Sequence, residues 1–503
     1  MDNITVIDLL KKYKTWMEKD EIQFLKKGSF EYKGIAKSIN ELIGAFDEAA
    51  SSKNGDLSSI LDWNKTHELG GDLWKNLMSS CLKDIDPNAK GNSKLYDYIK
   101  NATEFEDLLY GLEDFYRDHT LHSLWVYFIG EYIMREKLPK YLGNLNWYVF
   151  NDIKDENDKL FSDAEEKVSK IHKKVSENLD AIWCVIALCH DLGYSMSKLT
   201  KLNKKVKGVL EFFDLDNVSL IGYALKIEHQ YNISQFLELM AIDVRVVQDK
   251  YEKETQIKCF RDDSTYWRLC RALEKQRHGI LSAYLIYKLL GIFADSWVSR
   301  TSEKLDEDEA IDNVIRGDIL FAIAQHDFDF AYLNSLGSLA DILIVSDELE
   351  EFSRFGRQLL TRKYQDTMAS SKIDFEINKK EVEITFIYEV AKHRDLGDFF
   401  RIKAERLAQV YTLNDETYVS PNSYEITKII MKAKKSPNTF EIEMTKTGKG
   451  IHTAELPEYK EYKKGLYKFE CKDDKISILM DDKKPVELEK WMKNFDGKSR
   501  EKK

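Results

Sequence analysis

The segment VIALCHDLGYS, residues 185–195, carries an apolar run directly into His190 and Asp191. The uncharged run AIWCVIALC (residues 181–189) is typical of a buried helix. A histidine and an aspartate at the end of such a helix place two possible metal ligands side by side. The dipeptide alone is a weak motif, because roughly one His-Asp pair is expected by chance. A second pair indeed stands at residues 326–327, so the meaning of the first depends on the rest of the chain.

Helical patterns extend on both sides of this segment. Apolar residues recur at helical spacing in LEDFYRDHTLHSLWVYFIGEYIM (112–134) and in GILSAYLIYKLLGIFADSW (279–297). No proline falls between Pro139 and Pro421, and a proline inside a helix removes a hydrogen bond and clashes with the preceding turn. Most of this span should therefore be helical, with an irregular insertion at NLNWYVFNDIKDENDK (144–159).

The pattern changes near residue 372. KIDFEINKKEVEITFIYEV (372–390) alternates apolar and polar residues around a polar centre, which is typical of a β-hairpin. A helical stretch follows at residues 396–411, and short alternating runs return in TFEIEMTK, GLYKFECK and KISILMDD. The expected fold is mainly α, with a helical core and a smaller C-terminal α+β domain. We predict an N-terminal helical region at residues 1–109, the core at 110–363 and the C-terminal domain at 372–503.

Charge and composition exclude several classes of protein. The chain of 503 residues has 76 Lys and Arg against 87 Asp and Glu, a formal net charge of -11, so nucleic acid is disfavoured as a partner. No apolar run approaches the roughly 20 residues of a membrane span, and the amino terminus does not resemble a signal peptide. The six cysteines form no CxxC pair. We expect a cytoplasmic protein without membrane contact.

Further histidines and an aspartate stand in apolar helical contexts, in a fixed order along the chain. The series is HSLWV at His122, CHDLG at His190 and Asp191, RHGILSA at His278, AQHDF at His326 and ILIVSDELEEFSR at Asp347. Over about residues 110–360 this series resembles the HD-domain superfamily of metal-dependent phosphohydrolases. The resemblance includes the apolar residues around each position.

The resemblance implies two sets of metal ligands. His122, His190, Asp191 and Asp347 match the four positions that hold the first metal. His278 and His326 match the added histidines of those members that hold two. Two competitors remain in the sequence, because His119 stands one turn before His122 and Asp341 precedes Asp347. The HxxxV spacing to Val126 and the apolar face before Asp347 favour His122 and Asp347, while His229 is left as a structural or substrate-facing residue.

These ligand types also predict the chemistry. Imidazole and carboxylate suit a divalent metal such as Mn, Fe, Ni, Zn or Mg. Two ions about 3.5–4 Å apart, bridged by Asp191, would lower the pKa of a shared water and orient a phosphoryl group for in-line attack. We therefore expect a metal-dependent phosphohydrolase that hydrolyses an ester or anhydride in a phosphorylated small molecule, with a nucleotide as the expected substrate.

A phosphate substrate also needs cationic partners. The candidates near the ligands are Arg117, Arg277, Arg354 and Lys198. Arg117 and Arg354 could instead pair with neighbouring carboxylates on exposed helix faces. Lys198 opens the basic run KLTKLNKKVKG (198–208), which is either a solvated loop or a steering surface for a polyanion. The alternative functions are accordingly an HD-type single-strand nuclease and a non-catalytic scaffold that keeps the fold.

Overall fold

We describe the fold from a computed structural model of the chain. The structure describes residues 5–51, 63–109, 115–138, 148–149, 159–210, 230–249, 254–293, 304–328, 333–352, 354–357, 364–367, 369–390, 395–410, 423–445, 451–456, 465–472, 475–480 and 483–487. All statements below concern these residues.

Four helices form the N-terminal region, in agreement with the helical region predicted at residues 1–109. They are α1 (Val6–Glu18), α2 (Phe30–Ser51), α3 (Trp63–Ile85) and α4 (Asn92–Leu109). A capping box starts α1, where the side chains of Thr5 and Asp8 satisfy each other's backbone N–H groups. The indole of Trp74 in α3 donates to the carbonyl oxygen of Leu188 at 3.1 Å. This bond ties the N-terminal helices to the apolar run before His190.

The helical core is built around this apolar run. Its helices are α5 (His119–Tyr132), continued by a π-helical turn (Ile133–Lys137), α6 (Lys159–Ser176), α7 (Leu179–Cys189), α8 (Tyr194–Leu210), α9 (Gln230–Met240), α10 (Asp263–Glu274), α11 (His278–Leu290), α12 (Glu307–Gln325) and α13 (Leu339–Leu349). Every residue of α7 from Ala181 to Cys189 is buried, and the indole of Trp183 donates to the carbonyl oxygen of Tyr127 in α5. Each such buried large side chain stabilises the fold by about 1.5–3 kcal/mol.

A small sheet interrupts the span in which we expected mostly helix. Strands β3 (Ile242–Asp249) and β4 (Glu254–Arg261) form an antiparallel hairpin, flanked by β2 (Tyr148–Val149) and β5 (Lys304–Leu305). The absence of proline did not exclude these strands, since it permits a strand as readily as a helix. Of the expected insertion at residues 144–159, only 148–149 and 159 lie inside the described residues.

The C-terminal part confirms the change to alternating strands. Strands β9 (Ala369–Asn378) and β10 (Glu381–Val390) form the expected antiparallel hairpin, and α14 (Leu396–Val410) follows. Strand β11 (Tyr424–Lys435) then pairs with β10 in parallel and with β12 (Asn438–Thr445) in the antiparallel sense. The sheet continues through β13 (Ile451–Leu456), β14 (Gly465–Lys472), β15 (Lys475–Met480) and β16 (Lys483–Glu487). The fold is therefore mainly α, with an α+β C-terminal part.

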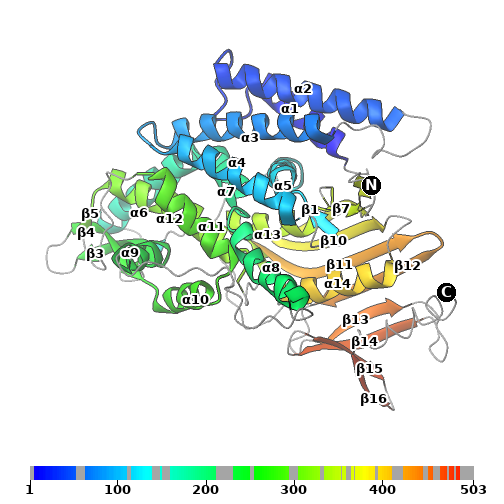
Figure 1. Cartoon of the computed structure of the whole chain (residues 1–503). Helices are drawn as coiled ribbons and strands as arrows, with labels where there is room; N and C mark the ends of the chain where they lie inside the picture. Colours follow the sequence, from blue (N-terminus) through cyan, green and yellow to red (C-terminus); the bar gives the residue numbers. More distant parts are fainter. Residues whose placement is uncertain are drawn as a thin grey trace.

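The helical core and the C-terminal sheet are joined by backbone pairing as well as by side chains. The short strand β6 (Ser335–Leu336), just before α13, pairs with the first residues of β11. A separate small sheet pairs β1 (Phe115–Arg117), β7 (Arg354–Arg357) and β8 (Tyr364–Thr367). Figure 1 shows α1–α3 along the top, β3–β5 at the left and β10–β12 at the right, with α5, α7 and α13 between them. Helices α5, α7 and α13 contact one another, α5 and α7 also contact α3, and α13 contacts β6 and β9.

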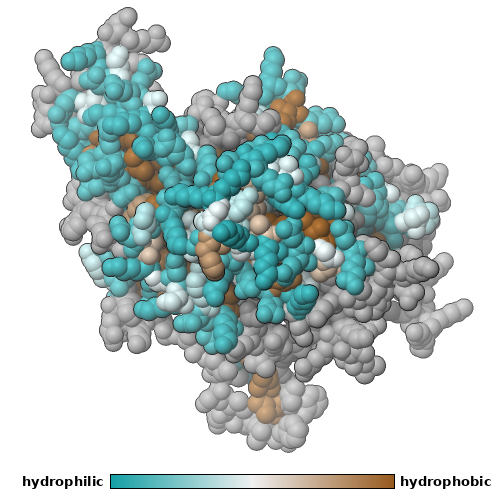
Figure 2. Space-filling model, turned by 90° about the horizontal axis from the view of Figure 1, so that it is seen from above, coloured by the Kyte–Doolittle hydropathy of each residue, from teal (hydrophilic) through white to brown (hydrophobic). Residues whose placement is uncertain are grey.

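The face seen from above in Figure 2 is largely hydrophilic, and its apolar residues lie in small separate groups. Only a few large apolar side chains among the described residues are strongly exposed, including Phe30 at 82% and Trp267 at 69%. No helix in the described part of the chain is both long and apolar enough to cross a membrane.

Candidate metal centre

The structure brings all six predicted ligands together at the ends of five helices. His122 lies one turn into α5, whose N-cap Asp118 accepts from the N–H of Leu121. His190 and His326 are the C-cap residues of α7 and α12, and Asp191 directly follows His190. His278 is the first residue of α11, and Asp347 lies in the last turn of α13. Because each ligand stands at or near a helix end, the convergence of the helices places them in one small volume.

Two glycines permit the closest of these approaches. A Cβ on Gly193, just after Asp191, would lie 2.4 Å from the carbonyl oxygen of His278. A Cβ on Gly279 would lie 2.8 Å from the carbonyl oxygen of Ile323 in α12. Both neighbouring atoms belong to the backbone, and both distances are shorter than the 3.0 Å below which Cβ contacts are essentially never seen. Glycine at these two positions therefore lets α11 approach both the turn after α7 and the end of α12.

The first group of ligands surrounds the Nε2 atom of His122. This atom lies 3.1 Å from His190 Nε2, 3.1 Å from Asp347 Oδ1 and 3.4 Å from Asp191 Oδ2. His122, His190 and Asp347 each offer one ligand atom within 4.8 Å of the others. These residues could hold a metal ion.

The second group faces the other oxygen of Asp191. Asp191 Oδ1 lies 3.2 Å from His278 Nε2 and 3.6 Å from His326 Nε2, and these two nitrogens are 3.0 Å apart. His190, Asp191 and His326 also fit a shared ion. The two carboxylate oxygens of Asp191 thus point at two different groups of imidazoles, as a bridging ligand requires.

The other ring nitrogen of each histidine is held by an acceptor. His190 and His326 place Nδ1 against backbone carbonyl oxygens, and His122 and His278 place Nδ1 against carboxylates. The four contacts are to Ala187 O at 2.8 Å, Ile323 O at 2.6 Å, Glu350 Oε2 at 2.7 Å and Asp327 Oδ2 at 2.7 Å, respectively. A carbonyl oxygen can only accept, so Nδ1 of His190 and His326 must carry the proton. In the neutral imidazoles Nε2 is then a lone-pair atom, as metal ligation requires.

This arrangement places electron-rich atoms against one another. The Nε2 lone pairs of neutral His122 and His190, 3.1 Å apart, do not attract each other, and carboxylate oxygens beside them add negative charge. Burial lowers the pKa of His190 to about 3, so this ring is neutral at physiological pH. Burial alone would raise the pKa of Asp191, but the surrounding imidazoles hold it well below its usual value. A divalent cation between these atoms satisfies the donor set, and the residues fit one.

His278 differs from His190 in its electrostatic surroundings. Burial alone would lower its pKa, but the carboxylates of Asp327 and Asp191 raise it to about 10. A metal ion that binds this imidazole therefore has to displace a proton, so the affinity for metal should fall as the pH is lowered.

The competing ligand candidates have other positions. His119 starts α5, and its ring lies against that of Tyr194 with 4.1 Å between the centroids. It lines a small cavity of about 40 Å³ that also reaches Asp191. Asp341 caps the start of α13 by accepting from the N–H groups of Gly337 and Ser338. Neither competitor belongs to the two groups of ligand atoms, and His229 lies outside the described residues.

We expect His122→Ala and His119→Ala to differ sharply in metal content. His122→Ala removes an Nε2 atom that faces three other ligands, so the first ion should be lost. His119→Ala enlarges the neighbouring cavity and should leave the bound metal unchanged. Elemental analysis of both purified variants checks this. Equal metal loss in the two variants would return His119 to the ligand set.

The four predicted cations have different surroundings. Arg277 is the N-cap of α11 and lies 3.9 Å from Asp327, beside His278. Lys198 is buried on α8, with its ammonium 4.1 Å from the centre of the Tyr194 ring. Arg117 and Arg354 are direct backbone partners across β1 and β7, and their side chains lie outside the described residues. The basic run at residues 198–208 lies within helix α8.

Two residues that orient the ligands were missed by the sequence analysis. Glu350 is fully buried and holds Nδ1 of His122. Asp327 holds Nδ1 of His278 and accepts from the backbone N–H of the same residue at 2.9 Å. The signal that could have found them is their position, since Glu350 stands three residues after Asp347 and Asp327 directly follows His326. Carboxylates that hold the second ring nitrogen are a common feature of histidine metal sites.

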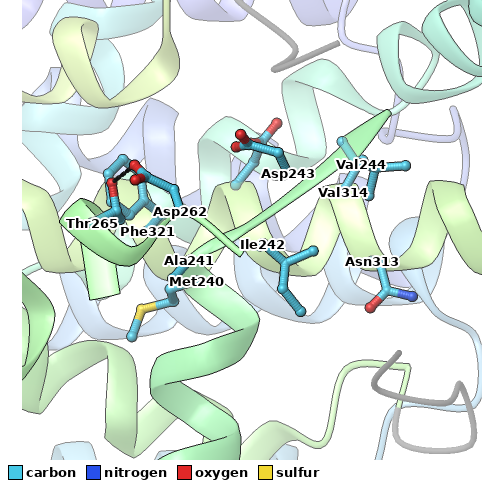
Figure 3. Close-up of a pocket in the computed structure, with 12 residues that line it drawn as sticks. Met240, Ala241, Ile242, Asp243, Val244, Asp262, Thr265, Asn313, Val314 and Phe321 are labelled. Atoms are coloured by element: carbon cyan, nitrogen blue, oxygen red, sulfur yellow. Dashed lines mark hydrogen bonds between the residues drawn. The ribbon is translucent and has the colours of Figure 1, made fainter. Parts of the chain in front are cut away.

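A second pocket lies away from the metal centre, between β3, α10 and α12. Figure 3 shows Asp243 and Asp262 at its lining, with Thr265 hydrogen-bonded to Asp262 at 2.6 Å. Asp318 from α12 also lines the pocket, and burial raises its pKa to about 7. The three carboxylates make this pocket acidic, whereas the metal centre combines carboxylates with imidazoles.

The raised pKa of Asp318 predicts a pH-dependent effect of Asp318→Asn. In the unfolded chain this carboxyl ionises near pH 3.8 and in the folded protein near pH 7, so its contribution to stability is lost as the pH rises through this window. An asparagine at this position does not ionise, so the variant does not lose this stability as the pH rises. We expect the variant to match the wild type near pH 4 and to unfold with a free energy about 1–2 kcal/mol higher at pH 8, after allowance for partial solvent access. Urea unfolding at both pH values checks this, and an equal difference at both would contradict it.

Together the fold and the site define a mainly helical protein with a buried histidine and aspartate centre that could bind metal. Comparison with protein-family models, with curated proteins and with solved structures finds no match to this chain. The chemistry of the site is therefore the evidence for its function.

Proposed function

We propose that the protein is an HD-type metal-dependent phosphohydrolase, with two divalent ions bound across Asp191. The observation that carries the proposal is the opposed direction of the two Asp191 oxygens, one toward His122 and the other toward His278 and His326. His122, His190, Asp191 and Asp347 would hold the first ion, and Asp191, His278 and His326 the second. When bound, two such ions polarise a phosphoryl group and lower the pKa of a shared water.

The chain's own residues supply orientation and charge. Glu350 and Asp327 fix the rings of His122 and His278, so that each Nε2 stays directed at the centre. Asp347 is the most exposed of the carboxylate ligands, with 15% of its side chain accessible, and marks the side from which a substrate would enter. Arg277 and Lys198, beside His278 and Tyr194, are the described candidates for binding substrate phosphate.

The proposed substrate is a nucleotide or a related phosphorylated small molecule. A single-strand nuclease is the second candidate, because the basic residues of α8 follow directly after Asp191. The net charge of -11 favours the small molecule. A cytoplasmic location is part of the proposal, and the free thiols of the described cysteines are compatible with it.

The decisive experiment combines metal analysis with a substrate screen. The purified chain should contain up to two divalent ions, and with Mn²⁺ supplied it should release phosphate or nucleoside from one class among nucleotides, cyclic dinucleotides and short single strands. Cleavage of single strands alone would favour the nuclease. Full metal occupancy without hydrolysis of any class would favour a scaffold that keeps the HD fold.

A further inference from the structure

The last turn of α13 performs two tasks at the metal centre. It supplies the ligand Asp347, and the next residue after the helix, Glu350, holds His122 by its Nδ1 atom. This turn is therefore the element whose position decides how His122 and Asp347 meet. A helix C-terminus leaves its last carbonyl groups without intrahelical partners, so something else has to satisfy them.

Side chains of the C-terminal α+β part satisfy these carbonyl groups. The carbonyl oxygen of Glu348 accepts from Lys403 Nζ at 2.8 Å and from the Tyr388 hydroxyl at 3.0 Å. The carbonyl oxygen of Leu349 accepts from the Ser371 hydroxyl at 2.6 Å. Ser371, Tyr388 and Lys403 lie on β9, β10 and α14. Three separate elements of the C-terminal part thus contact a single helical turn.

Ion pairs of Lys403 and Arg406 strengthen the same contact, and those of Lys403 are buried. Lys403 Nζ lies 2.7 Å from Glu351 Oε1 and 3.8 Å from Glu348 Oε2, and Arg406 Nε donates to Glu348 Oε1 at 2.5 Å. Lys403 is 6% exposed and Glu351 is fully buried. A cation at a helix C-terminus is also favoured by the helix dipole. Removing one partner of such a buried pair leaves the other charge uncompensated, so the contact holds the turn firmly.

We propose that the C-terminal α+β part is a structural component of the metal centre, with Lys403 as the positioning residue that fixes the last turn of α13. This inference rests on the proposed metal centre and extends it to Lys403, 56 positions beyond Asp347. Lys403 acts through the backbone of Glu348 and the side chain of Glu351, and thereby sets the geometry of Asp347 and Glu350 around the first ion. The second group, at His278 and His326, has no ligand on this turn.

The test is a Mn²⁺ titration followed by electron paramagnetic resonance, which distinguishes free from bound ion. Lys403→Met should weaken the first site about 10-fold to 100-fold, as loss of an orienting contact does, and leave the second site unchanged. If Lys403 acted only through its charge, its removal would tighten cation binding, because a positive charge near the ion would be gone. Unchanged or tighter binding in a folded Lys403→Met protein would overturn the proposal.

Two further variants complete the experiment. Arg401→Met is the matched control, because Arg401 lies on the same helix and, among the described residues, forms ion pairs with Asp398 and Glu405 of that helix; the variant should bind Mn²⁺ as the wild type does. Tyr388→Phe removes one hydrogen bond to Glu348 without changing charge, and it should weaken the first site severalfold even if Lys403→Met fails to fold. A wild type that binds no Mn²⁺ would refute the metal centre itself. If the wild type and the Tyr388→Phe protein bind Mn²⁺ with equal affinity, the metal centre stands and only this inference is refuted.

Discussion

Replacing Asp191 with asparagine is expected to abolish metal binding and hydrolysis together. One oxygen of this carboxylate faces His122 and the other faces His278 and His326, so both ions lose a charged ligand at once. Polarisation by the metal stabilises the transition state by several kcal/mol, and about 1.4 kcal/mol of stabilisation corresponds to a factor of ten in rate. Turnover should therefore fall by at least about a thousandfold, and bound metal should fall from two ions to less than one per chain.

The measurement is elemental analysis beside a hydrolysis assay on the same preparation. Asp243→Asn is the matched control, since Asp243 pairs with Arg245 on β3 and lies outside the two ligand groups. Circular dichroism should show that both variants are folded. An Asp191→Asn protein that still holds two ions per chain would sink the assignment of Asp191 as the bridging ligand.

Replacing His278 or His326 with alanine is expected to remove one ion and leave the other. Their Nε2 atoms are 3.0 Å apart and both face the same Asp191 oxygen, so they belong to one ion under the two-metal model. The first group keeps His122, His190 and Asp347 intact. Metal content should fall by about one ion per chain, and turnover should fall with it.

A one-metal centre gives a different result for the same variants. The two imidazoles would then act as hydrogen-bond donors to the substrate, so metal content would stay constant while turnover fell. His172→Ala on α6 is the matched control and should change neither quantity. A wild type that saturates at one ion per chain in excess metal would rule out the two-metal model.

The local pattern of the sequence determined the secondary structure and the identity of the ligand candidates. The uncharged run before His190 forms the fully buried helix α7, and the alternation at residues 372–390 forms the β9–β10 hairpin. These predictions held because a helical or strand periodicity is set by residues close together in the chain. The β3–β4 hairpin was missed, since an absence of proline does not distinguish a strand from a helix.

Which of the ligand candidates lie close together depends on the packing of the helices in the tertiary structure. His122 lies among the ligands and His119 lines the neighbouring cavity because helix packing directs two residues of the same helix to different neighbours. Glu350 holds the ring of His122, which lies 228 positions earlier in the chain. Lys403 donates to the backbone of Glu348, which lies 55 positions earlier. A local sequence pattern cannot predict contacts between residues so far apart in the chain, because these contacts arise from the close approach of packed elements. The residue pattern therefore identified the candidate ligands, while the packing of α13 between the helical core and the C-terminal sheet determined how these side chains are held.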